Sequence, residues 1–236
     1  IRMMKNKKTI NNIPGCFARW SRYQHWLMAV LLVMISAVGS NAQQTALSKL
    51  GIDLIPYPKE VKLLETEFLL DPAVTLVLDK NASAQDKFAA EELIRHLREE
   101  TGLSIPITGK PGRRSIMLTR KGADKKSGEQ GYSLRAGTDL LTISAGTEAG
   151  LFYGVQTLLQ LVQQRGSEHF VKGINIVDWP DTRIRAVHYD TKHHQDKREY
   201  VEELIRELSR YKINMLVWEW EDKFLYPSHP EIGAPG

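Results

Sequence analysis

Histidine and carboxylate side chains gather at two places near the end of the chain. The first is the run His188–Asp196 and the second is the run Glu219–Asp222. Imidazoles, carboxylates and ammonium groups can hydrogen-bond a polar ligand, bind metal ions or transfer protons. Each run directly follows a segment typical of a β-strand, and in parallel β/α proteins the C-terminal ends of strands form the ligand-binding face. The two runs therefore predict a site for a polar ligand.

Side chains alternate between two faces along a strand predicted over 213–221. Trp218 and Trp220 share one face, which would pack against helices, whereas Glu219 and Glu221 share the other. In a β/α barrel that second face points to the interior, and buried carboxylates need partners or a ligand. Two interpretations stay open, namely contacts to a polar ligand and salt bridges to Lys or Arg side chains of other strands.

The histidines of the first run do not favour a metal site. The spacing of His188, His193 and His194 matches no common zinc motif, so we expect neither a metal nor a cofactor. Positioning of a polar ligand by Lys192 and His193 is the preferred interpretation, and ordinary surface roles are the alternative.

A strand–helix–strand unit must position both runs. Strands are predicted over 185–190 and 213–220, and the helix between them begins near Asp196, taken as its cap. One face of that helix is apolar and consists of Val201, Leu204, Ile205, Leu208 and Tyr211. Such a tight βαβ unit has parallel strands, and eight β/α units over about 250 residues make a TIM barrel. Residues 183–236 therefore predict the truncated start of an α/β TIM barrel, and the chain is expected to be a fragment.

Residues 52–177 predict a small α+β accessory domain, a sheet with two helices. Ser83 and Asp86 fit a capping box at the start of the first helix, and Gly102 fits its end. Strands are predicted at 61–64, 68–70, 74–78, 105–108, 116–119, 132–135, 140–145 and 171–177. A linker over 178–181 leads into the barrel unit.

Thr147 is predicted to open the second helix of this domain. The glycines around that turn, Gly146, Gly150 and Gly154, show no phosphate-loop pattern. Their small size instead favours close packing of the helix on the sheet.

Residues 1–42 predict a secretory signal peptide. They contain six basic and no acidic residues, and the apolar run Leu27–Val38 is too short for a comfortable membrane span. The whole chain carries +4, so residues 43–236 carry −2, and a nucleic-acid partner is not expected. We expect an exported protein, periplasmic or extracellular, with a linker at 43–51 and a membrane contact only if the signal segment is uncleaved. The single cysteine, Cys16, lies in this leader and leaves the mature chain without an internal disulfide.

Several motifs resemble glycoside hydrolase family 20, the β-N-acetylhexosaminidases, and the resemblance covers nearly all of residues 52–236. The run Gly150–Gly154 (Gly-Leu-Phe-Tyr-Gly) followed by Gln156–Leu158 is similar to a signature of the family's accessory α+β domain. The residues that match the family's first two barrel strands are Asp190, His194, Tyr211, Lys212, Asn214 and Asp222.

The resemblance implies removal of terminal β-linked N-acetylhexosamine from a glycan, with the substrate's acetamido oxygen as nucleophile. This family is an exception to the two-carboxylate scheme. The resemblance places the catalytic Asp-Glu pair on a later barrel strand, beyond Gly236. The substrate-binding residues are predicted by position instead, because the C-terminal ends of adjacent barrel strands carry Lys192, His193, Glu219 and Asp222.

The chain also departs from the family's pattern. His193-His194 stands where better-known members have Arg-His, and Val217 and Glu219 replace two histidines. These changes resemble a divergent, hexosaminidase-D-like branch. The alternatives are an O-GlcNAcase-like or α-glucuronidase-like glycosidase, and a carbohydrate-binding barrel without catalysis.

Overall fold

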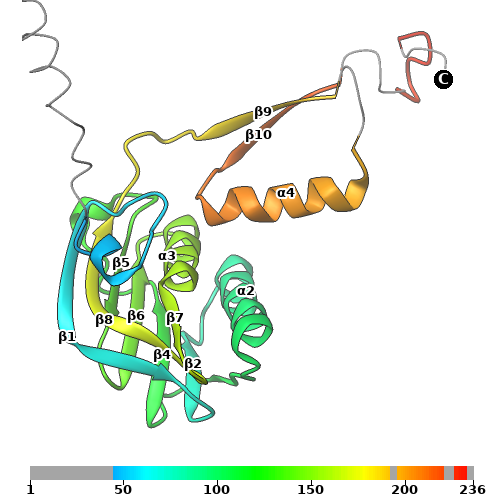
Figure 1. Cartoon of the computed structure of the whole chain (residues 1–236). Coiled ribbons are helices and arrows are strands. Elements are labelled where there is room, and N and C mark those ends of the chain that lie inside the picture. The colour runs from blue at the N-terminus through cyan, green and yellow to red at the C-terminus, as the bar shows by residue number, and fades with distance from the viewer. Residues whose placement is uncertain (1–44, 192–195, 221–225, 233–236) are drawn as a thin grey trace, which may run out of the picture. The chain divides into compact units, whose positions relative to one another are not determined.

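The computed structural model describes residues 45–191, 196–220 and 226–232. Its larger part is an α+β domain built on an eight-stranded mixed sheet (Figure 1). The strands are β1 (Glu60–Leu70), β2 (Val74–Leu78), β3 (Ile107–Thr108), β4 (Arg114–Thr119), β5 (Tyr132–Ala136), β6 (Leu140–Ala145), β7 (Val162–Arg165) and β8 (Glu168–Asp178). The helices of this domain are α2 (Ala84–Thr101) and α3 (Glu148–Leu161), with short 3-10 turns at Ser48–Leu50 and Lys125–Ser127. The predicted α+β class and its two helices are confirmed.

The sheet runs in the order β1-β8-β5-β6-β4-β2-β3, with β7 paired to β8. Strands β3, β2, β4 and β6 are mutually parallel, whereas β5, β8, β1 and β7 pair antiparallel. Both α2 and α3 pack on the same face of this sheet (Figure 1). The core lies between that face and the helices, where Leu93 of α2, Leu158 of α3 and Ile116 of β4 are buried.

Local sequence signals place the helix ends. Ser83 accepts a hydrogen bond from the amide of Asp86, whose carboxylate accepts from the amide of Ser83, so the predicted capping box is confirmed. Gly102 ends α2 with a left-handed φ of 73°, a conformation that glycine adopts at low cost. Thr147 caps α3 by accepting from the amide of Gly150, as predicted.

Glycine is required where α3 crosses the sheet. A Cβ on Gly150 would lie 3.0 Å from the Cβ of Ala145 and closer still to the carbonyl oxygen of Gly131. A Cβ on Gly154 would collide with Ile143 and press on the Tyr132 ring. The close-packing interpretation is therefore confirmed for these two glycines, although Gly146 has room for a Cβ.

Gly150→Ala is expected to lower the free energy of unfolding by about 1–3 kcal/mol, the usual cost of overpacking a close-packed core. The better helix propensity of Ala, worth up to about 1 kcal/mol, offsets part of this cost. Urea unfolding followed by circular dichroism measures the change. Gly146→Ala is the matched control, because its Cβ would meet only the Gly128 oxygen at 3.7 Å. Equal stability of the two variants would contradict the packing argument.

Two strand predictions in this domain need correction. β1 is one continuous strand with a register irregularity between Leu63 and Glu67, where the sequence predicts two short strands. The chain leaves α3 at Val162, whose ψ of 127° is extended, and forms β7 at once, which the sequence does not predict. In both places pairing with β8 decides the backbone conformation.

The predicted strand–helix–strand unit is present. β9 (Ala186–Asp190) and β10 (Met215–Glu219) pair in parallel, and α4 (Arg198–Arg210) connects them (Figure 1). No residue of α4 is fully buried, and Ile205, Met215 and Val217 are about half exposed. None of the helices in the described part of the chain is both long and apolar enough to cross a bilayer.

Asp196 does not cap α4, so that prediction is wrong. The N-cap residue is Lys197, which makes no capping hydrogen bond through its side chain. The Asp196 carboxylate instead accepts a hydrogen bond from the Tyr189 hydroxyl of β9. Because the Asp196 side chain makes this contact to β9, it does not cap the helix.

Candidate active-site strand ends

The ends of β9 and β10 bring an imidazole and a carboxylate together. In the register of the two strands, His188 lies opposite Val217 and Asp190 lies opposite Glu219. The side chains of these four residues share one face of the two-stranded sheet. The Nε2 atom of His188 lies 2.7 Å from Oε2 of Glu219, and both side chains are partly exposed. One carboxylate is therefore held at the strand end by a neighbouring strand.

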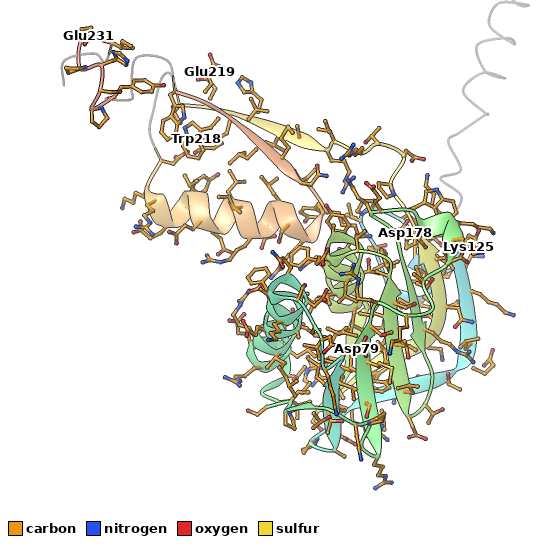
Figure 2. The ribbon with its side chains drawn as sticks, turned by 180° about the vertical axis from the view of Figure 1, so that it is seen from behind. Asp79, Lys125, Asp178, Trp218, Glu219 and Glu231 are labelled. Carbon is orange, nitrogen blue, oxygen red and sulfur yellow. The ribbon has the colours of Figure 1, made fainter. Side chains whose placement is uncertain are left out.

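Aromatic rings occupy the opposite face of these strands. Trp218 stacks on Trp220 with ring centroids 4.9 Å apart, and Tyr189 lies 4.8 Å from Trp218. The hydrogen bond to the Asp196 carboxylate raises the pKa of Tyr189 to about 12. Figure 2 shows Trp218 directed toward α4 and Glu219 directed away from it. The predicted separation of tryptophans and Glu219 onto two faces is confirmed.

Thr191 links the two strand ends. Its amide and its hydroxyl both donate to the carbonyl oxygen of Glu219, at 3.2 and 2.8 Å. Thr191 is buried, so the backbone that carries Glu219 is tied to the end of β9.

Three of the four predicted substrate-binding residues, Lys192, His193 and Asp222, lie outside the described residues, as do His194 and Glu221. Glu219 is described, and the structure pairs it with His188. His188 is not among the residues predicted for this position. Its spacing of two from Asp190 places it on the correct face, but only the register of β9 against β10 makes it a neighbour of Glu219.

A second, buried polar cluster lies at the other end of β10. Lys212 donates from Nζ to Oδ2 of Asp178 at 2.9 Å and to the hydroxyl of Tyr132 at 3.0 Å. Tyr132 in turn donates to Asp178 and shares a hydrogen bond with Thr157 of α3. The resemblance included Lys212 among the matching residues, and the structure places it away from the strand end that carries Glu219.

Burial dominates the titration of this second cluster. Burial lowers the pKa of the Lys212 ammonium, and the neighbouring Asp178 carboxylate opposes that shift because it favours the charged form. Burial and the same carboxylate raise the pKa of Tyr132 well above its ordinary value, so its hydroxyl remains a donor at neutral pH. Within the described part of the chain no three His, Cys, Asp or Glu side chains form a group that could hold a metal ion.

Known proteins resemble this chain in both sequence and structure. A family model described as glycosyl hydrolase family 20, domain 2, matches residues 51–179. A β-hexosaminidase of Porphyromonas gingivalis is 28% identical over 224 residues, which is 86% of this chain and 28% of that protein. The chain thus spans less than a third of the length of the curated relatives that it matches.

Solved structures show the same relationship. The family 20 β-N-acetylhexosaminidase from Streptomyces coelicolor A3(2) superposes with a TM-score of 0.66 and 27% identity, covering 76% of this chain and 38% of that structure. The Streptomyces plicatus N-acetyl-β-hexosaminidase is 29% identical with a TM-score of 0.64, over 75% of this chain and 35% of that structure. Because the family model covers more than half of its residues, the chain belongs to glycoside hydrolase family 20.

Proposed function

We propose that this chain is the N-terminal part of an exported glycoside hydrolase that removes terminal β-linked N-acetylhexosamine from glycans. In this proposal the α+β domain is accessory and β9–α4–β10 begins a TIM-barrel catalytic domain. The observation that carries it is the placement of Glu219. Its carboxylate stands at the C-terminal end of a parallel strand, on the face opposite the tryptophans, in a βαβ unit that follows the segment matched by the family 20, domain 2 model.

The exposed apolar surface of the βαβ unit supports the barrel part of the proposal. Parallel sheets are rarely stable without cover on both faces, and this one leaves Met215, Val217 and Trp220 exposed by about two fifths. Further β/α units would cover both the sheet and α4. The face that carries His188 and Glu219 would then line the barrel interior.

The proposed chemistry is substrate-assisted hydrolysis with retention of configuration. The acetamido oxygen of the substrate attacks the anomeric carbon while a carboxylic acid protonates the leaving oxygen. The Asp-Glu pair that orients the acetamido group and transfers the proton is proposed to follow Gly236. In this chain Glu219, Asp222, Lys192 and His193 are proposed to bind hydroxyl groups of the terminal sugar, where carboxylates accept and the cationic groups donate.

The direct test compares a longer protein that continues beyond Gly236 with the 236-residue chain. Both are incubated with chromogenic β-linked N-acetylglucosaminide and N-acetylgalactosaminide. The longer protein is expected to release the chromophore, and the chain alone is expected to match its heat-killed control, because it lacks the proposed catalytic pair. Turnover by the chain alone would refute the placement of the catalytic pair. If the longer protein released no chromophore from either substrate, the proposed activity would be refuted.

A further inference from the structure

The strands that carry the proposed sugar-binding residues are anchored at their N-terminal ends in the α+β domain. Lys212 lies three residues before β10, and its ammonium group is buried against Asp178 of β8 and Tyr132 of β5. It is also the one non-glycine residue with a positive φ, 59°, in the described ranges 45–191, 196–220 and 226–232. Such a conformation persists where the surroundings over-determine it.

Arg185, which directly precedes β9, reaches the same place. Its Nε donates to the carbonyl oxygen of Lys212 at 2.7 Å, and its Nη1 donates to Oε1 of Gln130 at 2.8 Å. The guanidinium carbon also lies 5.1 Å from the ring centre of Tyr153 in α3. The residues that lead into the two strands are thereby tied to one another and to the α+β domain.

Asn214 completes the tie between the two strands. Its Oδ1 accepts from the amide of Arg185 at 2.8 Å and its Nδ2 donates to the carbonyl oxygen of Arg183 at 2.8 Å. The polar residues at the base of the two strands are thus Tyr132, Asp178, Arg185, Lys212 and Asn214. One further polar link, from Gln160 of α3 to the carbonyl oxygen of Arg210, holds the end of α4.

Polar contacts must do most of this anchoring, because α4 contributes no fully buried residue. A strand also acts as a lever. Glu219 lies seven positions after Lys212, about 23 Å at 3.3 Å per residue, so a tilt of about 5° at the base moves the tip by about 2 Å. Displacements of about 1 Å in an active site can cost about a hundredfold in rate.

We infer that Asp178 is a positioning residue, which acts through Lys212 to set where β10 and its terminal Glu219 lie. The α+β domain is then the foundation on which the ligand-binding strand ends are aligned. The structural part of this inference stands on the contacts alone, and its catalytic consequence rests on the proposed function.

Hydrogen exchange of the full chain tests the structural part, with Asp178→Asn as the variant. The expected result is exchange at least about tenfold faster in the amides of β9 and β10, with β4 and β6 within about twofold of the parent chain. Asp181→Asn is the matched control. It breaks a Lys–Asp pair three residues away, between Lys59 and Asp181 at 2.6 Å, in which the Asp181 side chain is 80% exposed. This control is expected to change no region.

Equal acceleration in β4, β6, β9 and β10 would overturn the inference, because it would show general destabilisation without a positioning role. Unchanged exchange in β10 would overturn it as well. If Asp178→Asn does not fold, Tyr132→Phe supplies the test. It keeps both charges and removes the oxygen that Lys212 and Asp178 share, so exchange in β9 and β10 should still rise selectively.

Kinetics of an active longer protein test the catalytic consequence. Asp178→Asn is expected to lower kcat/KM by at least about tenfold at a temperature where the variant stays folded, whereas Asp181→Asn is expected to match the parent. A parent protein without hexosaminidase activity would refute the proposed function and leave the exchange result standing. Selective exchange with unchanged kinetics would refute the catalytic consequence of the inference.

Discussion

Glu219→Ala in a longer, active protein is expected to lower kcat/KM for a chromogenic N-acetylglucosaminide by at least about tenfold. A hydrogen bond between a charged group and a sugar hydroxyl contributes about 1.5–3 kcal/mol, and about 1.4 kcal/mol corresponds to a factor of ten. The same loss is expected for Asp222→Ala. Initial rates over a range of substrate concentrations measure both variants, and circular dichroism establishes that they are folded.

Glu231→Ala is the matched control for Glu219→Ala. Glu231 also lies beside a histidine, His229 at 3.5 Å, but its side chain is 71% exposed and it belongs to neither strand end. Its removal is expected to leave the kinetics unchanged. If Glu231→Ala lowered kcat/KM and Glu219→Ala did not, the proposed ligand-binding face would be wrong.

Lys212→Met is expected to lower the free energy of unfolding of the chain by about 3–5 kcal/mol, the usual cost of breaking a buried ion pair. The lost ammonium leaves the Asp178 carboxylate buried, and within the described part of the chain its remaining donors are the Tyr132 hydroxyl and the Lys59 amide. Urea unfolding followed by far-ultraviolet circular dichroism measures the change.

Two further variants separate this effect from a general sensitivity to lysine loss. Lys59→Met breaks the exposed pair with Asp181 and is expected to cost less than about 1 kcal/mol. The double variant Asp178→Leu/Lys212→Met removes both charges and is expected to regain most of the lost stability, because no buried charge remains unpaired. Equal losses for Lys212→Met and Lys59→Met would rule out a special role for the buried pair.

Signals carried by neighbouring residues predicted their elements correctly. The capping box at Ser83, the left-handed Gly102 and the cap at Thr147 were each readable within four residues of the helix end. The two-residue alternation also placed Trp218 and Glu219 on opposite faces. Caps and alternation depend on backbone geometry over a single turn or strand, so they hold unless a tertiary partner competes for the capping side chain.

The pairing of strands could not be predicted from the sequence, because it joins residues that are far apart in the chain. β1 pairs with β8, which lies about a hundred residues later in the chain, and this pairing makes β1 one continuous strand. Residues 162–165 also pair with β8, so that β7 forms directly after α3. The prediction of Asp196 as a helix cap failed for a related reason, since the hydroxyl of Tyr189 is a competing donor that only the fold brings near.

By itself, the sequence determined the α+β class, both ends of α2, the start of α3, the parallel βαβ unit and the face that Glu219 occupies. These follow from hydrophobic periodicity and from the backbone chemistry of Ser, Thr and Gly, which act locally. Only the tertiary structure decided that His188 is the neighbour of Glu219 and that Lys212 is buried against Asp178. The residues next to a histidine or a lysine in the sequence do not specify whether its side chain will be solvated, paired or buried. Its partner is chosen when strand register and domain packing bring distant side chains within hydrogen-bonding distance, where leaving them unpaired costs more than pairing them.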